Sequence, residues 1–359
     1  MKKFALLLAG LSCATISSLP AFAGDFYKLE KSTPLEGASP GWDYVTLDQS
    51  RQLLFMGRRE EGVTVFDIAA NKVKTEIANS KGANIALLIP ELDRGYSANE
   101  DGSSTQFELS TLKTLNRIKV GDDADSAFYD PVTKQVIVTM GDSKSLGFVD
   151  AKSGKVLGKL KTESGKLDHT VPDGKGNVIV AERDRNALLL VDVKARKIVG
   201  EWQTTGCVQP TGLAIDNANH RLFVGCRSKA PVLLVMDSTN GNVVATLEIG
   251  RGNDDVVYDA EAKKIYAANG IDANLVIFDQ LDADHYKLNQ AVTTRPMART
   301  MALDAKSKKV YLVCADGVAD AGQKINTGVG PFYPNLYYDN SFQLLTYATV
   351  SLTPKAAAD

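Results

Sequence analysis

Histidine and cysteine are scarce in this chain, which has three histidines and four cysteines among 359 residues. Motifs built from them, such as the Cys-x-x-Cys-His haem site and the paired ligands of zinc fingers, are missing. Glycine-rich phosphate loops and EF-hand calcium loops are missing as well. We therefore expect no metal, no cofactor and no catalytic residues. The formal net charge is only −2, so general binding of polyanions is not expected.

Long hydrophobic runs are absent beyond the N-terminal segment, so no membrane-spanning helix is expected. Residues 1–23 begin with Lys2 and Lys3, continue with an apolar run and end in Ala21-Phe22-Ala23. This pattern is typical of a cleaved secretory signal peptide. We therefore expect export to a periplasm of the Gram-negative type, a single domain over residues 24–353, and a frayed tail over residues 354–359.

An acidic residue recurs at a nearly constant spacing, each time at the end of an alternating apolar strand. The positions are Asp67, Glu108, Asp150, Asp192, Asp237 and Asp279, and the steps between them are 41, 42, 42, 45 and 42 residues. A second series with the same period consists of Asp48, Asp130, Asp173, Asp216, Asp259 and Asp304. A repeat of about 40–45 residues that carries four strands is a β-propeller blade. The sequence therefore predicts an all-β, seven-bladed β-propeller.

The seventh repeat lacks a fourth strand of its own. Its strands are expected at Thr300–Leu303, Lys309–Cys314 and Ser341–Ala348, after which the chain soon ends. Near the start of the chain, Phe26–Leu29 has the alternation of a strand and belongs to no other repeat. We expect this N-terminal strand to pair outside Ser341–Ala348 in the last blade. The pairing closes the ring and removes an exposed sheet edge.

Several second strands resemble the signature of the YVTN-repeat β-propellers, among them Ile265–Asn269, Val310–Val313 and Leu222–Val224. The stretch Cys207–Asp216, followed by Arg221–Cys226, is similar to the YncE-like periplasmic branch of that family. The resemblance covers nearly all of the chain after residue 23. It implies an exported seven-bladed propeller, with single-stranded DNA binding as one suggested activity, and it implies no catalytic residues.

The order of strands in a blade assigns each loop to one of two faces. The first strand starts on the face that we name the top face, and the second strand returns there. Cys207 precedes the first strand of the fifth repeat and Cys226 ends its second strand, so both lie on the top face. We expect a disulfide between them in an oxidising compartment. Cys314 is left without a partner, either as a buried thiol or as a reactive thiol near the channel.

Arginine is concentrated on the top face. Of thirteen arginines, eight map to it: Arg58, Arg59, Arg183, Arg185, Arg227, Arg251, Arg295 and Arg299. Guanidinium groups suit carboxylate or phosphate ligands. Top-face acids such as Asp43, Asp125, Asp168 and Asp254 could instead pair with these arginines. An anion site and a ring of ion pairs therefore both remain open.

A loop of 26 residues, 315–340, interrupts the seventh repeat and should also reach the top face. It carries Phe332, Tyr333, Tyr337 and Tyr338, and Trp42 starts a nearby strand. Loops of this length in compact domains are commonly functional. These aromatic side chains could stack on a planar ligand or nucleobases, or they could simply pack the loop onto the blade.

Three functions are consistent with these patterns. The first is a monomeric, non-enzymatic binding protein whose top face and 315–340 loop bind an anionic small molecule or an exported or outer-membrane protein partner. Its predicted ligand-binding residues are Arg58, Arg183, Arg185, Arg227, Arg299, Trp42, Tyr333 and Tyr337. The second is single-stranded DNA binding by the same face, which predicts steep weakening with salt. The third, a hydrolase or lyase with a metal in the funnel, rests on fold analogy alone, with Asp125, Asp168, His169 and Asp254 as candidates.

Overall fold

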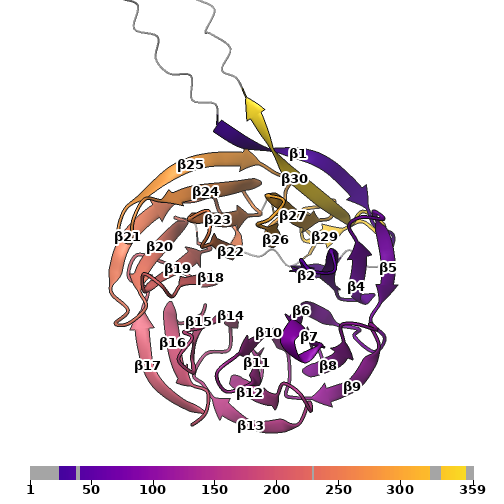
Figure 1. Cartoon of the computed structure of the whole chain (residues 1–359), viewed down its shortest axis with the longest axis vertical. Coiled ribbons are helices and arrows are strands. Elements are labelled where there is room, and N and C mark those ends of the chain that lie inside the picture. The colour runs from indigo at the N-terminus through magenta and orange to yellow at the C-terminus, as the bar shows by residue number, and fades with distance from the viewer. Residues whose placement is uncertain (1–23, 38–40, 229, 324–332, 353–359) are drawn as a thin grey trace, which may run out of the picture.

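The computed structural model of the chain describes residues 24–37, 41–228, 230–323 and 333–352. The expected signal peptide over residues 1–23 and the expected tail over residues 354–359 lie outside the described residues. Within the described residues, the strands form seven four-stranded antiparallel sheets and one small two-stranded sheet. Figure 1 shows the seven sheets arranged as a ring of blades around a central axis. The predicted seven-bladed propeller is confirmed.

The first six blades each use four consecutive strands, numbered outward from the axis. Blade 1 contains β2 (Trp42–Asp48), β3 (Leu53–Arg58), β4 (Gly62–Asp67) and β5 (Lys72–Glu76). Blade 2 contains β6 (Ala83–Ile89), β7 (Arg94–Asn99), β8 (Ser103–Glu108) and β9 (Thr114–Lys119), with a short 3₁₀ helix η1 (Pro90–Leu92) between its first two strands. Blade 3 contains β10 (Ala124–Asp130), β11 (Gln135–Met140), β12 (Ser145–Asp150) and β13 (Val156–Lys161).

The next three blades repeat the plan. Blade 4 contains β14 (Leu167–Pro172), β15 (Asn177–Glu182), β16 (Ala187–Asp192) and β17 (Lys197–Gln203). Blade 5 contains β18 (Pro210–Asp216), β19 (Arg221–Cys226), β20 (Val232–Asp237) and β21 (Val243–Glu248). Blade 6 contains β22 (Asn253–Asp259), β23 (Lys264–Asn269), β24 (Asn274–Gln280) and β25 (Tyr286–Thr293).

Blade 7 joins the two ends of the described chain. It contains β26 (Met301–Asp304), β27 (Lys309–Cys314), β30 (Gln343–Leu352) and, outermost, β1 (Gly24–Pro34). β1 pairs antiparallel with β30, so that Phe26 lies opposite Val350. The predicted closure by the N-terminal strand is therefore confirmed. Both strands are longer than Phe26–Leu29 and Ser341–Ala348 suggested, and Figure 1 shows their far ends extending beyond the ring.

The two middle strands of a blade are the most buried and the outermost strand is the least buried. Every residue of β3 and β11 is buried, whereas the outer strand β5 is almost fully exposed. Blades pack on one another through large apolar side chains, as where Phe55 of blade 1 stacks on Phe107 of blade 2 with ring centroids 5.9 Å apart. Because each blade buries its faces against two neighbours, the core grows with the ring and does not need to thicken.

A β-bulge near the start of the innermost strand is repeated around the ring. The register shifts there in β2, β6, β10, β14, β18 and β22. A bulge re-aims a side chain that would otherwise follow the alternation of the strand. The residues at this point are Asp43, Asn84, Asp125, Asp168, Thr211 and Asp254. In blade 7 the pairing of Met301 with Leu312 puts Arg299 at the same position.

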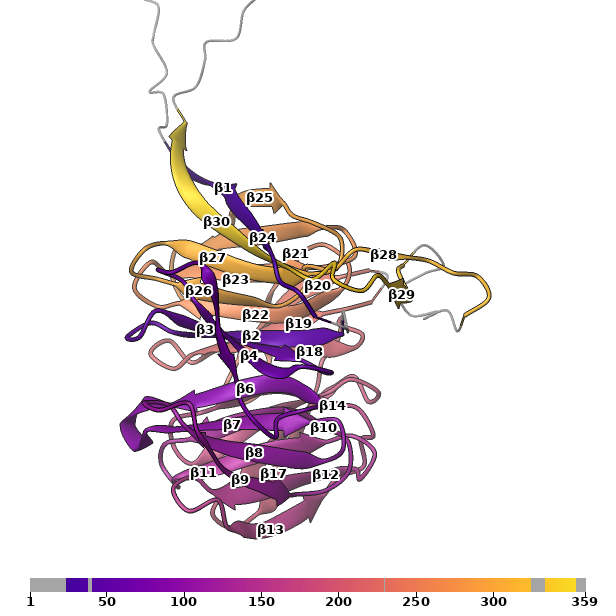
Figure 2. The same cartoon turned by 90° about the vertical axis from the view of Figure 1, so that its right-hand side faces the viewer.

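The 315–340 loop forms its own small structure. Its described ends include β28 (Gly317–Val318), which pairs with β29 (Leu336–Tyr337). Figure 2 shows this pair standing out from one face of the disc. Because Tyr337 lines a cavity together with the top-face arginines described below, this face is the top face. Phe332 and the rest of 324–332 lie outside the described residues.

Among the described residues, no helix has the length and apolar character needed to cross a bilayer.

Candidate functional site

A cavity of about 350 Å³ opens on the top face near the ring axis. We name it the top cavity. Its lining is Gly41, Trp42, Asp43, Tyr44, Arg59, Asp125, Asp168, Arg183, Arg227, Asp254, Met297, Arg299, Tyr333 and Tyr337. Four of these residues are arginines and four are aspartates, so charged groups of both signs dominate the site.

The aspartates reach the cavity because of the repeated bulge. Asp43, Asp125, Asp168 and Asp254 all stand at the bulge position of their innermost strands. Without the bulge, strict alternation would turn every second residue of the strand away from the axis. We name these four aspartates, which come from blades 1, 3, 4 and 6, the ring carboxylates. Arg299 occupies the same position in blade 7.

Three of the arginines also share one position, immediately after the second strand of a blade. The backbone N–H of each bonds to the carbonyl of the loop before the first strand: Arg59 to Gly41, Arg183 to Lys166 and Arg227 to Gln209. Glu100, Gly141 and Gly270 make the equivalent bond in blades 2, 3 and 6. From this position a long side chain can reach the bulge residue of the following blade. Arg59 does so with Asn84 (3.1 Å) and Arg227 does so with Asp254 (2.5 Å).

Arg227 and Arg299 share a single carboxylate. Arg227 Nη1 lies 2.5 Å from Asp254 Oδ1, and Arg299 Nε lies 2.7 Å from Asp254 Oδ2. Asp43 Oδ1 is farther from Arg299, at 3.6 Å. Burial disfavours the charge of Arg299, but Asp43 and Asp254 outweigh it and raise the pKa of the guanidinium. Both arginines are therefore fixed, charged and mostly shielded from water.

Arg183 turns back to its own blade, where its Nη1 lies 2.9 Å from Asp168 Oδ2. The hydroxyl of Tyr44 donates to the other oxygen of Asp168 at 3.1 Å. Burial alone would raise the pKa of Asp168, but Arg183 and Arg227 overcome it and lower the pKa. Asp168 therefore stays ionised as one half of a stable ion pair.

Asp125 differs from the other three aspartates. Among the described residues no hydrogen bond or ion pair reaches its carboxylate. Burial, followed by the charges of Asp123, Asp168 and Asp43, raises the pKa of Asp125 to about 8. Burial also raises the pKa of Asp43, to about 6, against the opposing charge of Arg299. At neutral pH Asp125 is thus largely protonated, while Asp43 and Asp168 are largely ionised.

One layer below the ring, His169 lies between aromatic side chains. Its ring centroid is 5.6 Å from that of Tyr44 and 4.9 Å from that of Phe128. Its Nδ1 is 3.9 Å from Asp255 Oδ1, and that nitrogen has no hydrogen-bond partner among the described residues. Burial lowers the pKa of His169 to about 4 and raises that of Asp255 to about 7. Near neutral pH this layer therefore holds an uncharged imidazole.

The aromatic residues of the site form a wall on the blade 7 side. Trp42 is only 3% exposed and packs edge-on against Tyr337, with ring centroids 5.2 Å apart. The guanidinium of Arg299 lies over the Trp42 ring at 5.0 Å. The hydroxyl of Tyr333 is buried without a hydrogen-bond partner among the described residues. Burial raises the pKa of Tyr333, and the nearby charges of Arg299 and Arg227 work against that rise.

Six of the eight predicted ligand-binding residues line the top cavity: Arg183, Arg227, Arg299, Trp42, Tyr333 and Tyr337. Arg58 does not. It is 1% exposed and lies inside the disc, with its guanidinium 4.7 Å from the Phe342 ring. Arg185 is exposed and pairs with Glu182 (3.5 Å) and Glu201 (3.3 Å) outside the cavity. Ligand binding by any of these residues stays a prediction.

The sequence-based set missed Arg59, Tyr44 and the four aspartates as ligand-facing groups. Arg59 follows Arg58 directly, and the choice between them depends on which residue ends the strand. The aspartates carried a usable signal, because Asp43, Asp125, Asp168 and Asp254 recur at the repeat period just inside the first strand. From the sequence these aspartates are interpreted as ion-pair partners for the arginines, and Asp125, Asp168 and Asp254 also as candidates for a funnel hydrolase or lyase.

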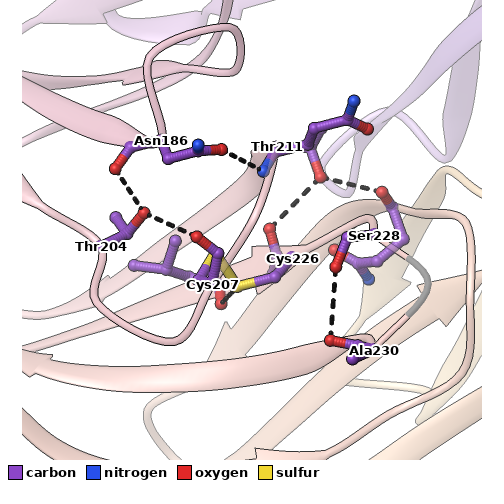
Figure 3. Close-up of a disulfide and its surroundings, with 11 residues drawn as sticks. Asn186, Thr204, Cys207, Thr211, Cys226, Ser228 and Ala230 are labelled. Atoms are coloured by element: carbon purple, nitrogen blue, oxygen red, sulfur yellow. Dashed lines mark hydrogen bonds between the residues drawn. A yellow bond between two sulfur atoms is a disulfide. The ribbon is translucent and has the colours of Figure 1, made fainter. Parts of the chain in front are cut away.

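The disulfide between Cys207 and Cys226 is present, with the two Cα atoms 5.4 Å apart. Figure 3 shows it beneath the top-face loops, where the Thr204 hydroxyl donates to the Asn186 carbonyl. The bond ties the loop before β18 to the end of β19, next to Arg227. Cys314 is a free, buried cysteine, and burial raises the pKa of its thiol to about 12. These features fit the inert alternative for Cys314.

No cluster of three or more His, Cys, Asp or Glu side chains with the geometry of a metal site occurs among the described residues. The carboxylates of the top cavity are spread around the ring, one to a blade, and arginines lie between several of them. The funnel-metal alternative stays a prediction.

Comparison with known proteins supports the fold and a distant relationship. No protein-family model matches the chain. Two curated relatives, both called Uncharacterized protein YncE, come from Salmonella typhi and Salmonella typhimurium and are each 23% identical over 178 residues. That match covers 48% of this chain and 50% of each relative, so the chain spans about half the length of the curated relatives it matches.

Solved structures with the same architecture come from unrelated assemblies. A chain of the mitotic checkpoint complex matches with a TM-score of 0.69 at 12% identity, covering 86% of this chain and 95% of that one. A chain of hydrazine synthase from Kuenenia stuttgartiensis matches with a TM-score of 0.66 at 15% identity, covering 82% and 98%. At such identities the likeness concerns the fold alone. The chain is a seven-bladed β-propeller with distant sequence similarity to YncE.

Proposed function

We propose that this propeller is a binding protein, and that its top cavity holds a small molecule with a carboxylate or phosphate group. The observation that carries the proposal is the pairing of two arginines, Arg227 and Arg299, with the single carboxylate of Asp254. The other carboxylate in reach of the pair, Asp43, lies 3.6 Å from Arg299 and is therefore the weaker counter-charge. The Tyr333 hydroxyl, which has no hydrogen-bond partner among the described residues, lies on the same side of the cavity.

The charge of the whole lining favours the same conclusion. Four arginines face four aspartates, and one of those aspartates, Asp125, is largely protonated near neutral pH. The lining by itself therefore has four arginines and three aspartates besides Asp125, and Arg59 also pairs with Glu100 outside the lining. Planar guanidinium groups bind carboxylate and phosphate oxygens with two parallel hydrogen bonds. The arginines are already held in place by ion pairs, so binding an anion would cost them little conformational entropy.

The size of the site favours a small ligand over a nucleic-acid strand. A cavity of about 350 Å³ is at the lower end of the range of small-molecule sites. Trp42, a possible stacking platform for bases, is almost fully buried against Tyr337 and Phe342. Exposed aromatic platforms are the main source of sequence-independent affinity for single strands. Single-stranded DNA therefore serves as a comparator in the test below.

Calorimetric titration of the chain from residue 24 onward would test the proposal. The ligands are acetate, succinate, phosphate and an oligo-dT strand, at low and at moderate salt. We expect a carboxylate or phosphate to bind, and Arg227→Gln and Arg299→Gln to weaken it at least tenfold, which is about 1.4 kcal/mol. The matched control is Arg185→Gln, an arginine on the same face that lies outside the cavity.

Two results would count against the proposal. Anion binding that Arg185→Gln weakens as much as Arg227→Gln would indicate a diffuse surface effect. Binding of oligo-dT alone, with a steep loss as salt rises, would favour the single-stranded DNA function instead.

Export to the periplasm is part of the proposal too, and it is checked by locating the full-length chain and a variant lacking residues 1–23 in cell fractions.

A further inference from the structure

We infer that the ligand of the top cavity is a zwitterion, whose anionic group is held by Arg227 and Arg299 and whose ammonium group is held by Asp125. This inference rests on the proposed function and narrows its class of ligand. It concerns the side of the cavity that faces away from the two arginines, and it is argued from the placement and partners of Asp125.

The ring order places Asp125 across the axis from the arginine pair. Asp125 belongs to blade 3, Asp254 to blade 6 and Arg299 to blade 7. In a ring of seven, blade 3 faces the boundary between blades 6 and 7. Figure 1 shows β10 on the opposite side of the axis from β22 and β26. A ligand lying across the cavity would therefore have one end near the arginines and the other near Asp125.

Asp125 is the ring carboxylate that forms no ion pair among the described residues. Asp254 has Arg227 and Arg299, Asp168 has Arg183, and Asp43 has the more distant Arg299. The missing partner has a structural cause. Arg59 and Arg227 each reach the bulge residue of the next blade, but the equivalent position before blade 3 is occupied by Glu100.

The groups that face Asp125 make it receptive to a cation. Asp123 in the preceding loop, Asp168 on β14 and Asp43 on β2 all raise the pKa of Asp125, and Lys166 alone among the main contributors lowers it. An ammonium group placed there would relieve the repulsion among these carboxylates. Because it would favour the ionised form of Asp125, binding would release the proton of Asp125 to solvent.

Proton release gives a signature with a definite sign. Below the pKa of Asp125, affinity for a zwitterion should rise with pH, by up to tenfold for each unit between pH 6 and pH 8. A plain carboxylate should behave in the opposite way. It gains nothing from Asp125, and ionisation of Asp43, with a pKa of about 6, and of Asp255, with a pKa of about 7, adds negative charge near its site.

The experiment compares two matched series of ligands by calorimetry at pH 7.5. One series is 4-aminobutyrate, 5-aminopentanoate and 6-aminohexanoate, and the other is butyrate, pentanoate and hexanoate. We expect at least one amino acid to bind ten times more tightly than the carboxylate of equal length. Asp125→Asn should reduce that ratio to below two, whereas Asp122→Asn, at an exposed acidic residue that pairs with Lys119 outside the cavity lining, should preserve it.

The outcomes separate this inference from the proposed function. If the carboxylates bind and no amino acid binds more tightly, the zwitterion is wrong and the anion site stands. If neither series binds, nor any anion of the earlier panel, both proposals are wrong. An amino-acid preference that Asp125→Asn leaves intact would place the ammonium group elsewhere and overturn the role of Asp125. Circular dichroism of Asp125→Asn confirms that the variant has folded.

Discussion

Glu100 occupies in blade 2 the position that Arg59 occupies in blade 1, and the two side chains form an ion pair with Arg59 Nη1 3.0 Å from Glu100 Oε1. The arginine is consequently drawn toward blade 2, where it also donates to Asn84. Glu100 itself offers no positive charge to blade 3. The glutamate at this repeated position, where blades 1, 4 and 5 have an arginine, therefore accounts for the absence of an ion pair at Asp125.

Replacing Glu100 by arginine should supply the missing partner. The new guanidinium would reach the bulge residue of blade 3, as Arg227 reaches Asp254 in blade 6. We expect the pKa of Asp125 to fall from about 8 toward its ordinary value, because a nearby positive charge favours the ionised carboxyl. Carbon-13 NMR titration of the Asp125 carboxyl measures this directly.

The control for that variant is Glu60→Arg, which makes the same change of charge at an exposed residue paired with Lys81. It should leave the titration of Asp125 where it was. If the pKa of Asp125 remains near 8 in Glu100→Arg, the charge at position 100 does not affect the ionisation of Asp125. The equivalence of Glu100 with the arginines would then have no electrostatic consequence.

Asp125→Asn should stabilise the folded protein, and more so as pH rises. The folded-state pKa of Asp125 is raised above the unfolded value of 3.8, so ionising it costs stability as pH increases from about 4 to about 8. Removing the group removes that cost. After allowance for solvent screening, we expect a gain on the order of 1–2 kcal/mol at pH 8 and a smaller one at pH 5. Urea unfolding at the two pH values measures the difference, and an equal effect at both would contradict the assignment.

Arg227→Gln should destabilise the fold, because Asp254 is largely buried and would keep only Arg299 as a partner. The expected loss is about 1–3 kcal/mol, the range for a buried charge that loses one hydrogen-bonded partner. Arg185→Gln should cost much less, because exposed ion pairs contribute little. Denaturant midpoints of the two variants and the parent decide the matter. Equal losses would mean that the pairing with Asp254 contributes nothing to stability.

Breaking the Cys207–Cys226 bond should lower the free energy of unfolding by about 3 kcal/mol, because the unfolded chain regains the freedom of the closed loop. The double variant Cys207→Ser and Cys226→Ser, unfolded in urea beside the parent, measures the loss.

In the parent lacking residues 1–23, a thiol reagent should modify Cys314 only after denaturation, because the thiol is buried and its pKa is about 12. Rapid labelling of the native protein would instead favour the reactive alternative for Cys314.

The repeat pattern was sufficient to predict the blades, the ring closure and the disulfide. The recurring acidic residues mark strand ends, and those ends are fixed by local turns: Asp48 accepts the N–H of Arg51, and Asp237 accepts that of Thr239. Phe26–Leu29 was assigned to blade 7 because no other repeat had room for it. Both inferences use short-range signals that a single sequence carries.

The top cavity was harder to predict because it depends on single-residue register. Arg58 ends β3 and turns inward to Phe342, while Arg59, one residue later, faces the cavity. Neighbouring residues of a strand point to opposite sides, so an error of one position exchanges a core residue for a ligand-facing one. The bulge that re-aims Asp125 has no sequence mark that strand alternation would reveal. The sequence does not distinguish Asp168, which pairs with Arg183, from Asp125, which forms no ion pair among the described residues.

The pairing of β1 with β30 also has a consequence for the folding of the chain. The first strand of the described chain finds its partner only after the last one has been made, since Phe26 pairs with Val350. Because loop closure over such a separation is slow, we expect blade 7 to be the last blade to be completed. Until then the edge of β30 or of its partner β27 is open to pairing with other chains. The unpaired edge of blade 7 is thus where we expect this protein to be most prone to aggregation until its two ends have met.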